Sequence, residues 1–165
     1  MVHIITDSAA DFQPREYEEL GVTCIPLRVA FGDTEFQENV DLSKVRFYTL
    51  LLGSGEFPKT SQASPAVLEG IFEDAKLKGD EAVYITLSSA LSGTYQTACM
   101  VREDVEYEGA FVFDSRNATG GQLFGNNSLV LSGQHAPDSG GGAEASSSVG
   151  VVGAVSVLSN FLDGV

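Results

Sequence analysis

The sequence has few basic residues, and this shortage limits the partners that it can bind. Lysine and arginine together number 9 of 165 residues, against 23 aspartate and glutamate residues, which gives a net charge of −14. Binding to nucleic acid requires a basic surface that neutralises backbone phosphates. Nine basic residues cannot form an extensive one, so we expect no nucleic-acid partner. The same charge argues against an anionic membrane surface.

Histidine and cysteine are also scarce, which argues against several kinds of active site. A nucleophilic serine needs an adjacent base, but the histidines are His3, in an apolar strand segment, and His135, in a glycine-rich region. Cys24 and Cys99 lack metal-ligand spacing and are expected to be buried free thiols of a reducing compartment. Neither a Gly-x-Ser-x-Gly motif nor a glycine-rich nucleotide loop occurs. We therefore expect no metal and no cofactor.

Long apolar runs are absent as well. No segment approaches the 18 consecutive apolar residues that a membrane-spanning helix needs, and no basic segment followed by an apolar one opens the chain. The sequence therefore predicts no transmembrane segment and a cytoplasmic protein.

What the sequence does contain is an alternation of short apolar strands with amphipathic helices. Helices are expected at 14–20, at 44–52 with Val45, Tyr48, Leu51 and Leu52 buried, at 65–78, and through Tyr95, Ala98, Val101 and Val105. Strands are expected at 2–5, 22–31, 83–87 and 110–113, with 34–36 returning as a hairpin. This order predicts an α/β fold with a parallel sheet.

Three of these strands end in small polar residues. The three clusters are Thr6-Asp7-Ser8, Ser88-Ser89 and Asp114-Ser115. Because parallel strands end at the same edge of a sheet, where α/β proteins bind ligands, we expect the clusters to share one cleft.

Hydroxyl groups dominate two further segments. Ser92-Gly93-Thr94 opens a helix, and Thr60-Ser61-Gln62 lies in an extended stretch between prolines. Hydroxyls and helix-start amides can bind a carboxylate without a buried cation, while apolar neighbours accept a hydrocarbon chain. An acyl ligand suits this combination, although well-capped turns that bind nothing would use the same residues.

Several motifs resemble those of the DegV family of bacterial fatty-acid-binding proteins. They occur in the family's order over about residues 3–121, and they are Ile5-Thr6-Asp7-Ser8-Ala9-Ala10-Asp11, Pro26-Leu27, Asp41-Leu42-Ser43, Thr60-Ser61-Gln62-Ala63-Ser64-Pro65, Leu87-Ser88-Ser89-Ala90-Leu91-Ser92-Gly93-Thr94-Tyr95-Gln96 and Asp114-Ser115. Ala63 and Ala90 depart from the family's usual Pro and Gly.

The resemblance implies a parallel-sheet α/β/α sandwich that binds a long-chain fatty acid. It places the carboxylate on the hydroxyls of Thr60, Ser61 and Ser92, with support from Ser89, Gly93, Thr94, Asp7, Ser8, Asp114 and Ser115. It also implies that the protein has no catalytic activity and presents its ligand to an ATP-dependent fatty-acid kinase subunit, which makes acyl phosphate for phospholipid synthesis.

The family pattern stops near Gly121-Gln122, where related proteins continue into a second α/β domain. From residue 117 onward the sequence has no lysine or arginine and has ten of its 18 glycines. We expect an N-terminal domain over 1–121 and an irregular Gly/Ser-rich tail over 122–165, either read out of frame or left from a truncated second domain.

Two alternatives to a fatty-acid-binding module stay open at this point. The first is an enzyme that acts on a small acidic metabolite through Asp7, Asp114 and Arg116, since a lone arginine is a suitable anion anchor. The second is an inactive remnant of a longer binding protein.

Overall fold

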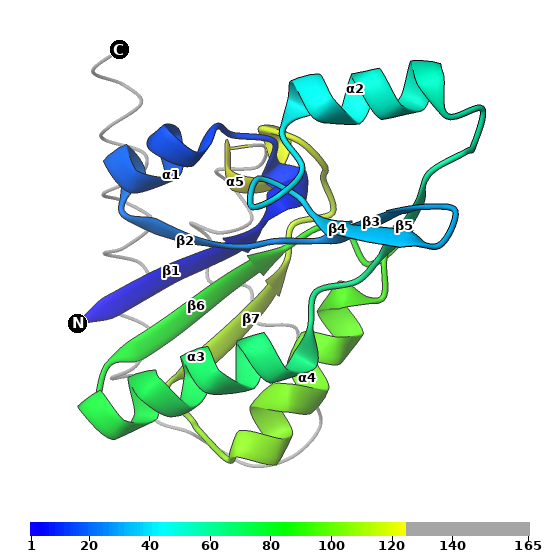
Figure 1. The fold of residues 1–165 in the computed structure, drawn as a ribbon. Coiled ribbons are helices and arrows are strands. Elements are labelled where there is room, and N and C mark those ends of the chain that lie inside the picture. Colours follow the sequence, from blue (N-terminus) through cyan, green and yellow to red (C-terminus); the bar gives the residue numbers. More distant parts are fainter. Residues whose placement is uncertain (125–165) are drawn as a thin grey trace.

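The computed structural model describes residues 1–124, and these contain a four-stranded parallel sheet. Its strands are β1 (Val2–Asp7), β2 (Val22–Ile25), β6 (Glu81–Thr86) and β7 (Ala110–Asp114), in the spatial order β2-β1-β6-β7 (Figure 1). The α/β prediction is therefore confirmed. Thr6 and Asp7, expected in a loop, are instead the last two residues of β1, and the short 3-10 helix η1 (Ser8–Ala10) follows them.

Helices cover both faces of this sheet. On one face, α3 (Pro65–Lys78) and α4 (Thr94–Val105) bury Leu68, Phe72, Ala98 and Val101 against Ile5 and Tyr84 of the sheet. On the other face, α1 (Pro14–Leu20) packs Tyr17 against Val22 and Ile4. Neighbouring residues of a strand point to opposite faces, so Ile4 and Ile5 serve different layers.

Proline and glycine set the ends of α1 and α3, and both helices have the predicted bounds. Pro14 and Pro65 occupy the first turns of α1 and α3, while Gly21 and Gly79 end them in the left-handed conformation. Ser64 precedes α3 but makes no capping hydrogen bond with its side chain.

A second, antiparallel sheet lies beside the first. It consists of β3 (Arg28–Phe31), β4 (Thr34–Gln37) and β5 (Lys59–Ser61), in the order β4-β3-β5. The expected hairpin between β3 and β4 is confirmed, but the single strand predicted over 22–31 is wrong. Pro26 and Leu27 separate β2, at the edge of the parallel sheet, from β3, so the two halves belong to different sheets.

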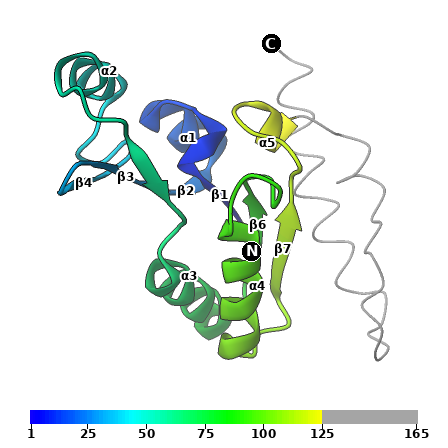
Figure 2. The ribbon, with the colours of Figure 1, turned by 90° about the vertical axis from the view of Figure 1, so that its right-hand side faces the viewer.

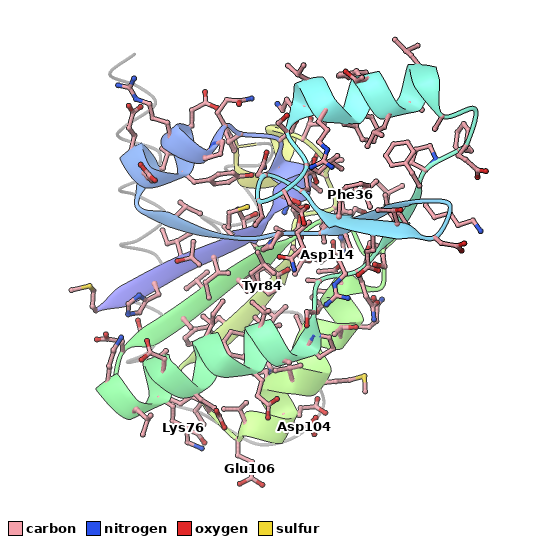
Figure 3. The ribbon with its side chains drawn as sticks, viewed as in Figure 1. Phe36, Lys76, Tyr84, Asp104, Glu106 and Asp114 are labelled. Atoms are coloured by element: carbon pink, nitrogen blue, oxygen red, sulfur yellow. The ribbon has the colours of Figure 1, made fainter. Side chains whose placement is uncertain are left out.

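Helix α2 (Lys44–Gly53) lies over this small sheet (Figure 2), and of the four residues predicted on its buried side only Leu51 packs there. Phe47, Leu50 and Leu51 pack against a cluster that contains Phe36 (Figure 3), whereas Val45 is 78% exposed and Leu52 87%. Tyr48, also expected inside, is 60% exposed. The helix carries apolar residues all round, and spacing alone does not tell which side faces a core.

The last described element, α5 (Gly121–Phe124), begins at the expected domain boundary and continues past it. Gln122 is buried beneath the ends of the parallel strands, next to Thr6 and Asp7. The tail predicted after it lies outside the described residues from position 125 onward.

Cys24 and Cys99 are free thiols but half-buried rather than fully buried, and burial raises the pKa of Cys24 to about 11.

The end of α4 offers a stability test. Glu106 ends the helix with φ 51° and ψ 50°, a left-handed conformation that is unfavourable for any residue with a Cβ. The side chain lies at the end of the molecule where Lys76 caps α4 through the Val105 carbonyl oxygen, at 2.7 Å (Figure 3). Glu106→Gly is expected to raise the free energy of unfolding by about 0.5–1 kcal/mol, measured by urea denaturation followed by circular dichroism.

A glycine inside the same helix supplies the control. Glu103→Gly places a glycine at an exposed position inside α4 and should lower the free energy of unfolding by about 1 kcal/mol. If both glycine variants lose stability alike, the conformation of Glu106 carries no strain.

Candidate functional site

The polar ends of β1, β6 and β7 meet at one edge of the parallel sheet, as predicted. Asp7 has no exposed surface, and its carboxylate accepts three hydrogen bonds: from the Leu87 N–H at 2.8 Å, the Ala9 N–H at 3.2 Å and Gln122 Nε2 at 2.9 Å. Asp7 thus fixes the start of the loop between β6 and α4. We call Asp7, Gln122, Ser89 and Asp114 the strand-end network.

Asp114, at the end of β7, also binds the loop between β6 and α4, as Asp7 does from the end of β1. Its carboxylate accepts the Ser89 N–H at 3.0 Å and the Ser89 hydroxyl at 2.5 Å, so it holds the middle of the same loop (Figure 3). Next to it, Ser115 donates its hydroxyl to the Asn117 carbonyl oxygen and accepts the Asn117 N–H. The Ser88 N–H in turn donates to the Asn117 carbonyl oxygen.

Ser8 connects the two sheets. Its hydroxyl donates to Glu38 Oε2 at 2.7 Å and accepts the Leu27 N–H at 2.9 Å, so one side chain joins η1 to the link between β2 and β3. Ser8 is almost fully buried. Its contacts are with the protein's own chain.

The pKa values of the carboxyl groups in this region are shifted in opposite directions. Burial raises the pKa of Asp7, although its hydrogen-bond donors act against that shift, and burial likewise raises the pKa of Glu38. Burial also acts to raise the pKa of Asp114, but the Ser89 hydroxyl and the N–H groups of Ser89 and Arg116 outweigh it, and the pKa is lowered. Asp114 therefore stays ionised to lower pH than Asp7.

The residues expected to bind the carboxylate are placed differently from this network. Thr60 and Ser61 are exposed on β5, which pairs with β3 at the edge of the small sheet. Ser92 is half-buried, and its hydroxyl lies 2.9 Å from the hydroxyl of the buried Thr94. It also accepts the Thr94 N–H at 3.2 Å, at the first turn of α4.

One contact brings these two segments together. A Cβ placed on Gly93 would lie 2.6 Å from Gln62 Oε1, so the Gln62 side chain rests directly on the backbone at Gly93. Gln62 follows Ser61 and Gly93 follows Ser92. The segments 60–62 and 92–94, thirty residues apart in the chain, are therefore neighbours in space.

The predicted residues thus divide into two groups. One group makes side-chain hydrogen bonds within the protein and consists of Asp7, Ser8, Ser89, Asp114 and Ser115. In the other group, Thr60 and Ser61 have exposed side chains. Asp7 cannot touch a substrate in this conformation, which weakens the enzyme alternative built on it with Asp114 and Arg116. Within residues 1–124, no group of three or more histidine, cysteine or acidic side chains is arranged to hold a metal ion. Nor is any helix in that range both long and apolar enough to cross a membrane.

Sequence reasoning missed three residues of this region. Gln122 donates to Thr6, Asp7 and the Ile85 carbonyl oxygen, Glu38 binds Ser8, and Gln62 covers Gly93. Each partner lies at least 30 residues away in the chain, so no local pattern indicates the pairing. The sequence offered one indication, which is that Gln62 and Gly93 both occur in the motifs that resemble those of the DegV family.

Comparison with known proteins identifies the family of this chain. The model of the DegV family, described as uncharacterised proteins, matches residues 1–144. This chain belongs to the DegV family. A DegV domain-containing protein of Caldanaerobacter subterraneus subsp. tengcongensis is 36% identical over 130 residues, covering 79% of this chain and 45% of the relative. One from Halalkalibacterium halodurans is 40% identical over 115 residues, covering 69% and 41%.

Solved structures of DegV-like proteins include several with fatty acids. A stearic acid-binding protein from Eubacterium ventriosum is 30% identical, with a TM-score of 0.66, and the match covers 74% of this chain and 45% of that one. A Thermotoga maritima protein whose structure reveals fatty acid binding function is 31% identical, with a TM-score of 0.64, over 72% and 44%. The match thus spans less than half the length of these DegV relatives.

Proposed function

We propose that this DegV-family chain binds a long-chain fatty acid through its carboxylate, with Thr60, Ser61 and Ser92 as the hydrogen-bonding side chains. The observation that carries the proposal is the contact of Gln62 with Gly93, which joins the two hydroxyl-bearing segments into one surface. Fatty-acid binding by the similar proteins of Eubacterium ventriosum and Thermotoga maritima supports it.

The state of the other polar residues supports the same assignment. Asp7, Ser89, Asp114 and Ser8 make hydrogen bonds inside the protein, so they can hold the loop before α4 in place without meeting a ligand. Thr60 and Ser61 expose their side chains, and Ser92 is half-buried in the neighbouring segment 92–94.

Apolar side chains adjoin both hydroxyl segments. Phe57 is 87% exposed three residues before Thr60, and Leu91 is exposed directly before Ser92. Each methylene of an acyl chain that such side chains remove from water contributes about 0.8 kcal/mol. A long chain therefore gains more from these neighbours than a short one.

Replacing the hydroxyls tests the site. Thr60→Ala and Ser92→Ala are each expected to weaken palmitate binding by about 1–3 kcal/mol, because the carboxylate loses a hydrogen bond. Equilibrium dialysis of the 165-residue chain with labelled palmitate measures the effect. Thr34→Ala is the control, since Thr34 is an exposed hydroxyl on β4. Full affinity in both site variants would reject the assignment.

The proposal extends to the protein's role. We propose that the chain itself is not an enzyme, works in the cytoplasm, and presents the carboxylate to an ATP-dependent kinase subunit, with residues 1–121 as the folded binding domain. Acyl phosphate formed by a purified kinase subunit only when this chain is present would support that role. Binding of short polar acids in place of long-chain ones would favour the enzyme alternative. If the chain binds neither kind of acid, an inactive remnant is favoured.

A further inference from the structure

Gly93 is not required by its own backbone conformation. It precedes α4 with φ −75° and ψ 2°, angles that any residue adopts. The Gln62 carboxamide occupies the space that a side chain would take there, with its Oε1 2.6 Å and its Cδ 3.8 Å from a Cβ built at this position. Real Cβ atoms essentially never approach another atom more closely than 3.0 Å. A side chain at 93 would therefore make the Gln62 carboxamide, the end of a flexible side chain, move aside.

The Gln62 carboxamide next to Gly93 is not fixed by hydrogen bonds. Within residues 1–124, neither Oε1 nor Nε2 of Gln62 has a hydrogen-bond partner, and the residue is exposed. A carboxamide carries an acceptor at one end and two donors at the other, and a half-turn about its last bond exchanges them. Gln62 can therefore present either kind of group to the surface between Ser61 and Ser92.

We propose that Gln62 is the residue that selects an ionised carboxylate at the fatty-acid site, by turning Nε2 toward the ligand and donating a hydrogen bond to it. This inference rests on the proposed function and deepens it. Thr60, Ser61 and Ser92 carry hydroxyls, which donate and accept and so also suit a neutral alcohol or ester. The Gln62 carboxamide adds N–H donors to the site, and a donor binds a charged carboxylate oxygen more strongly than the neutral oxygen of an alcohol or ester.

The substitution Gln62→Glu tests this selection, because it keeps the size of the side chain and replaces the donor by a negative charge. Palmitate binding at pH 7 should weaken by about tenfold or more through like-charge repulsion, while binding of hexadecanol changes little. Equilibrium dialysis with both ligands gives the ratio. Gln37→Glu adds the same charge to an exposed residue of β4 and should leave the ratio unchanged.

A second pair of variants tests the contact itself. Gly93→Ala should weaken palmitate binding when Gln62 is present, because the new methyl displaces the carboxamide, and should weaken it less in the Gln62→Ala background. The urea midpoint should change little in either background, because the displaced group is the end of a flexible, exposed side chain. A large drop in the midpoint would mean that Gly93→Ala weakens binding by disturbing the fold and not through Gln62.

The outcomes separate the inference from the proposed function. If the unmodified chain binds no palmitate, the proposed function fails and the selection by Gln62 fails with it. If it binds palmitate and Gln62→Glu weakens acid and alcohol equally, or neither, only the role of Gln62 is overturned. Equal effects of Gly93→Ala in both backgrounds would mean that Gly93 acts on the ligand directly.

Discussion

Replacing Asp7 by alanine is expected to lower the free energy of unfolding by about 3 kcal/mol, since each buried donor left unpaired costs about 1–3 kcal/mol. The substitution leaves the N–H groups of Leu87 and Ala9 and the Nε2 of Gln122 without their acceptor. Removing a buried charge offsets part of that loss, because burial itself disfavours the ionised Asp7. Urea denaturation followed by circular dichroism suits a chain without tryptophan.

Asp7→Asn is the matched variant. Its side-chain oxygen can still accept the Leu87 N–H, but its amide group must face the Nε2 of Gln122, so the loss should be smaller than in Asp7→Ala. If Asp7→Ala unfolds at the same urea concentration as the unmodified chain, the strand-end network does not stabilise this fold.

The two carboxyl groups of the network also differ in how their contribution depends on pH. The pKa of Asp7 is raised above its ordinary value of 3.8, so between the two values the folded protein binds a proton that the unfolded chain releases. Stability relative to Asp7→Asn should therefore fall as the pH rises from about 4 to the folded pKa of Asp7. The pKa of Asp114 is lowered, so its contribution is present above pH 4 and is lost as the pH falls.

Phe72→Ala should cost still more, about 3–5 kcal/mol, because it removes a large side chain from the centre of the core and leaves a cavity. Phe72 is 0% exposed and lies between α3 and the parallel sheet, in a cluster with Ile5, Leu68 and Tyr84. The urea midpoint should drop with little change in the slope of the transition.

Phe57→Ala removes the same side chain from an exposed position. Phe57 is 87% exposed before β5, so its loss should change the free energy of unfolding by no more than about 0.5 kcal/mol. A loss in Phe57→Ala as large as in Phe72→Ala would mean that Phe57 is covered in solution. The same variant should still weaken palmitate binding if the acyl chain lies against this residue.

Much of the fold was predictable because local chemistry decides where its helices begin and end. Proline opens α1 and α3, glycine closes them, and the predicted bounds agree with those observed. The core side of α3 was predictable as well, since Leu68, Phe72 and Ala75 recur at helical spacing among polar residues. Here pattern and packing agree.

The errors occur where the pattern fits two structures. Helix α2 has apolar residues on the side that packs, such as Phe47, and on the side that does not, such as Val45. The segment 22–31 reads as one apolar, extended run, and nothing local reveals that the first half pairs in parallel with β1 while the second pairs with β4. Such choices depend on partners elsewhere in the chain.

The candidate site was predictable in its residue types and not in its connections. Polar residues at three strand ends indicated a common edge, and the structure brings them together there. The division between residues that bind each other, such as Ser89 and Asp114, and residues left exposed, such as Thr60, depends on distances that the sequence does not contain. The pairings of Gln122 with Asp7 and of Gln62 with Gly93 are of the same kind.

Arg28 and Ser61 are the first and last residues of the small sheet along the chain, and they pair with each other. This pairing determines how the protein can be altered. The chain leaves the main domain at Leu27 and returns at Gln62, and the residues next to these points are direct neighbours across β3 and β5. Residues 28–61 therefore form an insertion with adjoining ends, placed between one strand and the helix that follows. A short turn could replace it, or another protein's counterpart could be exchanged for it, without changing the order of the parallel strands.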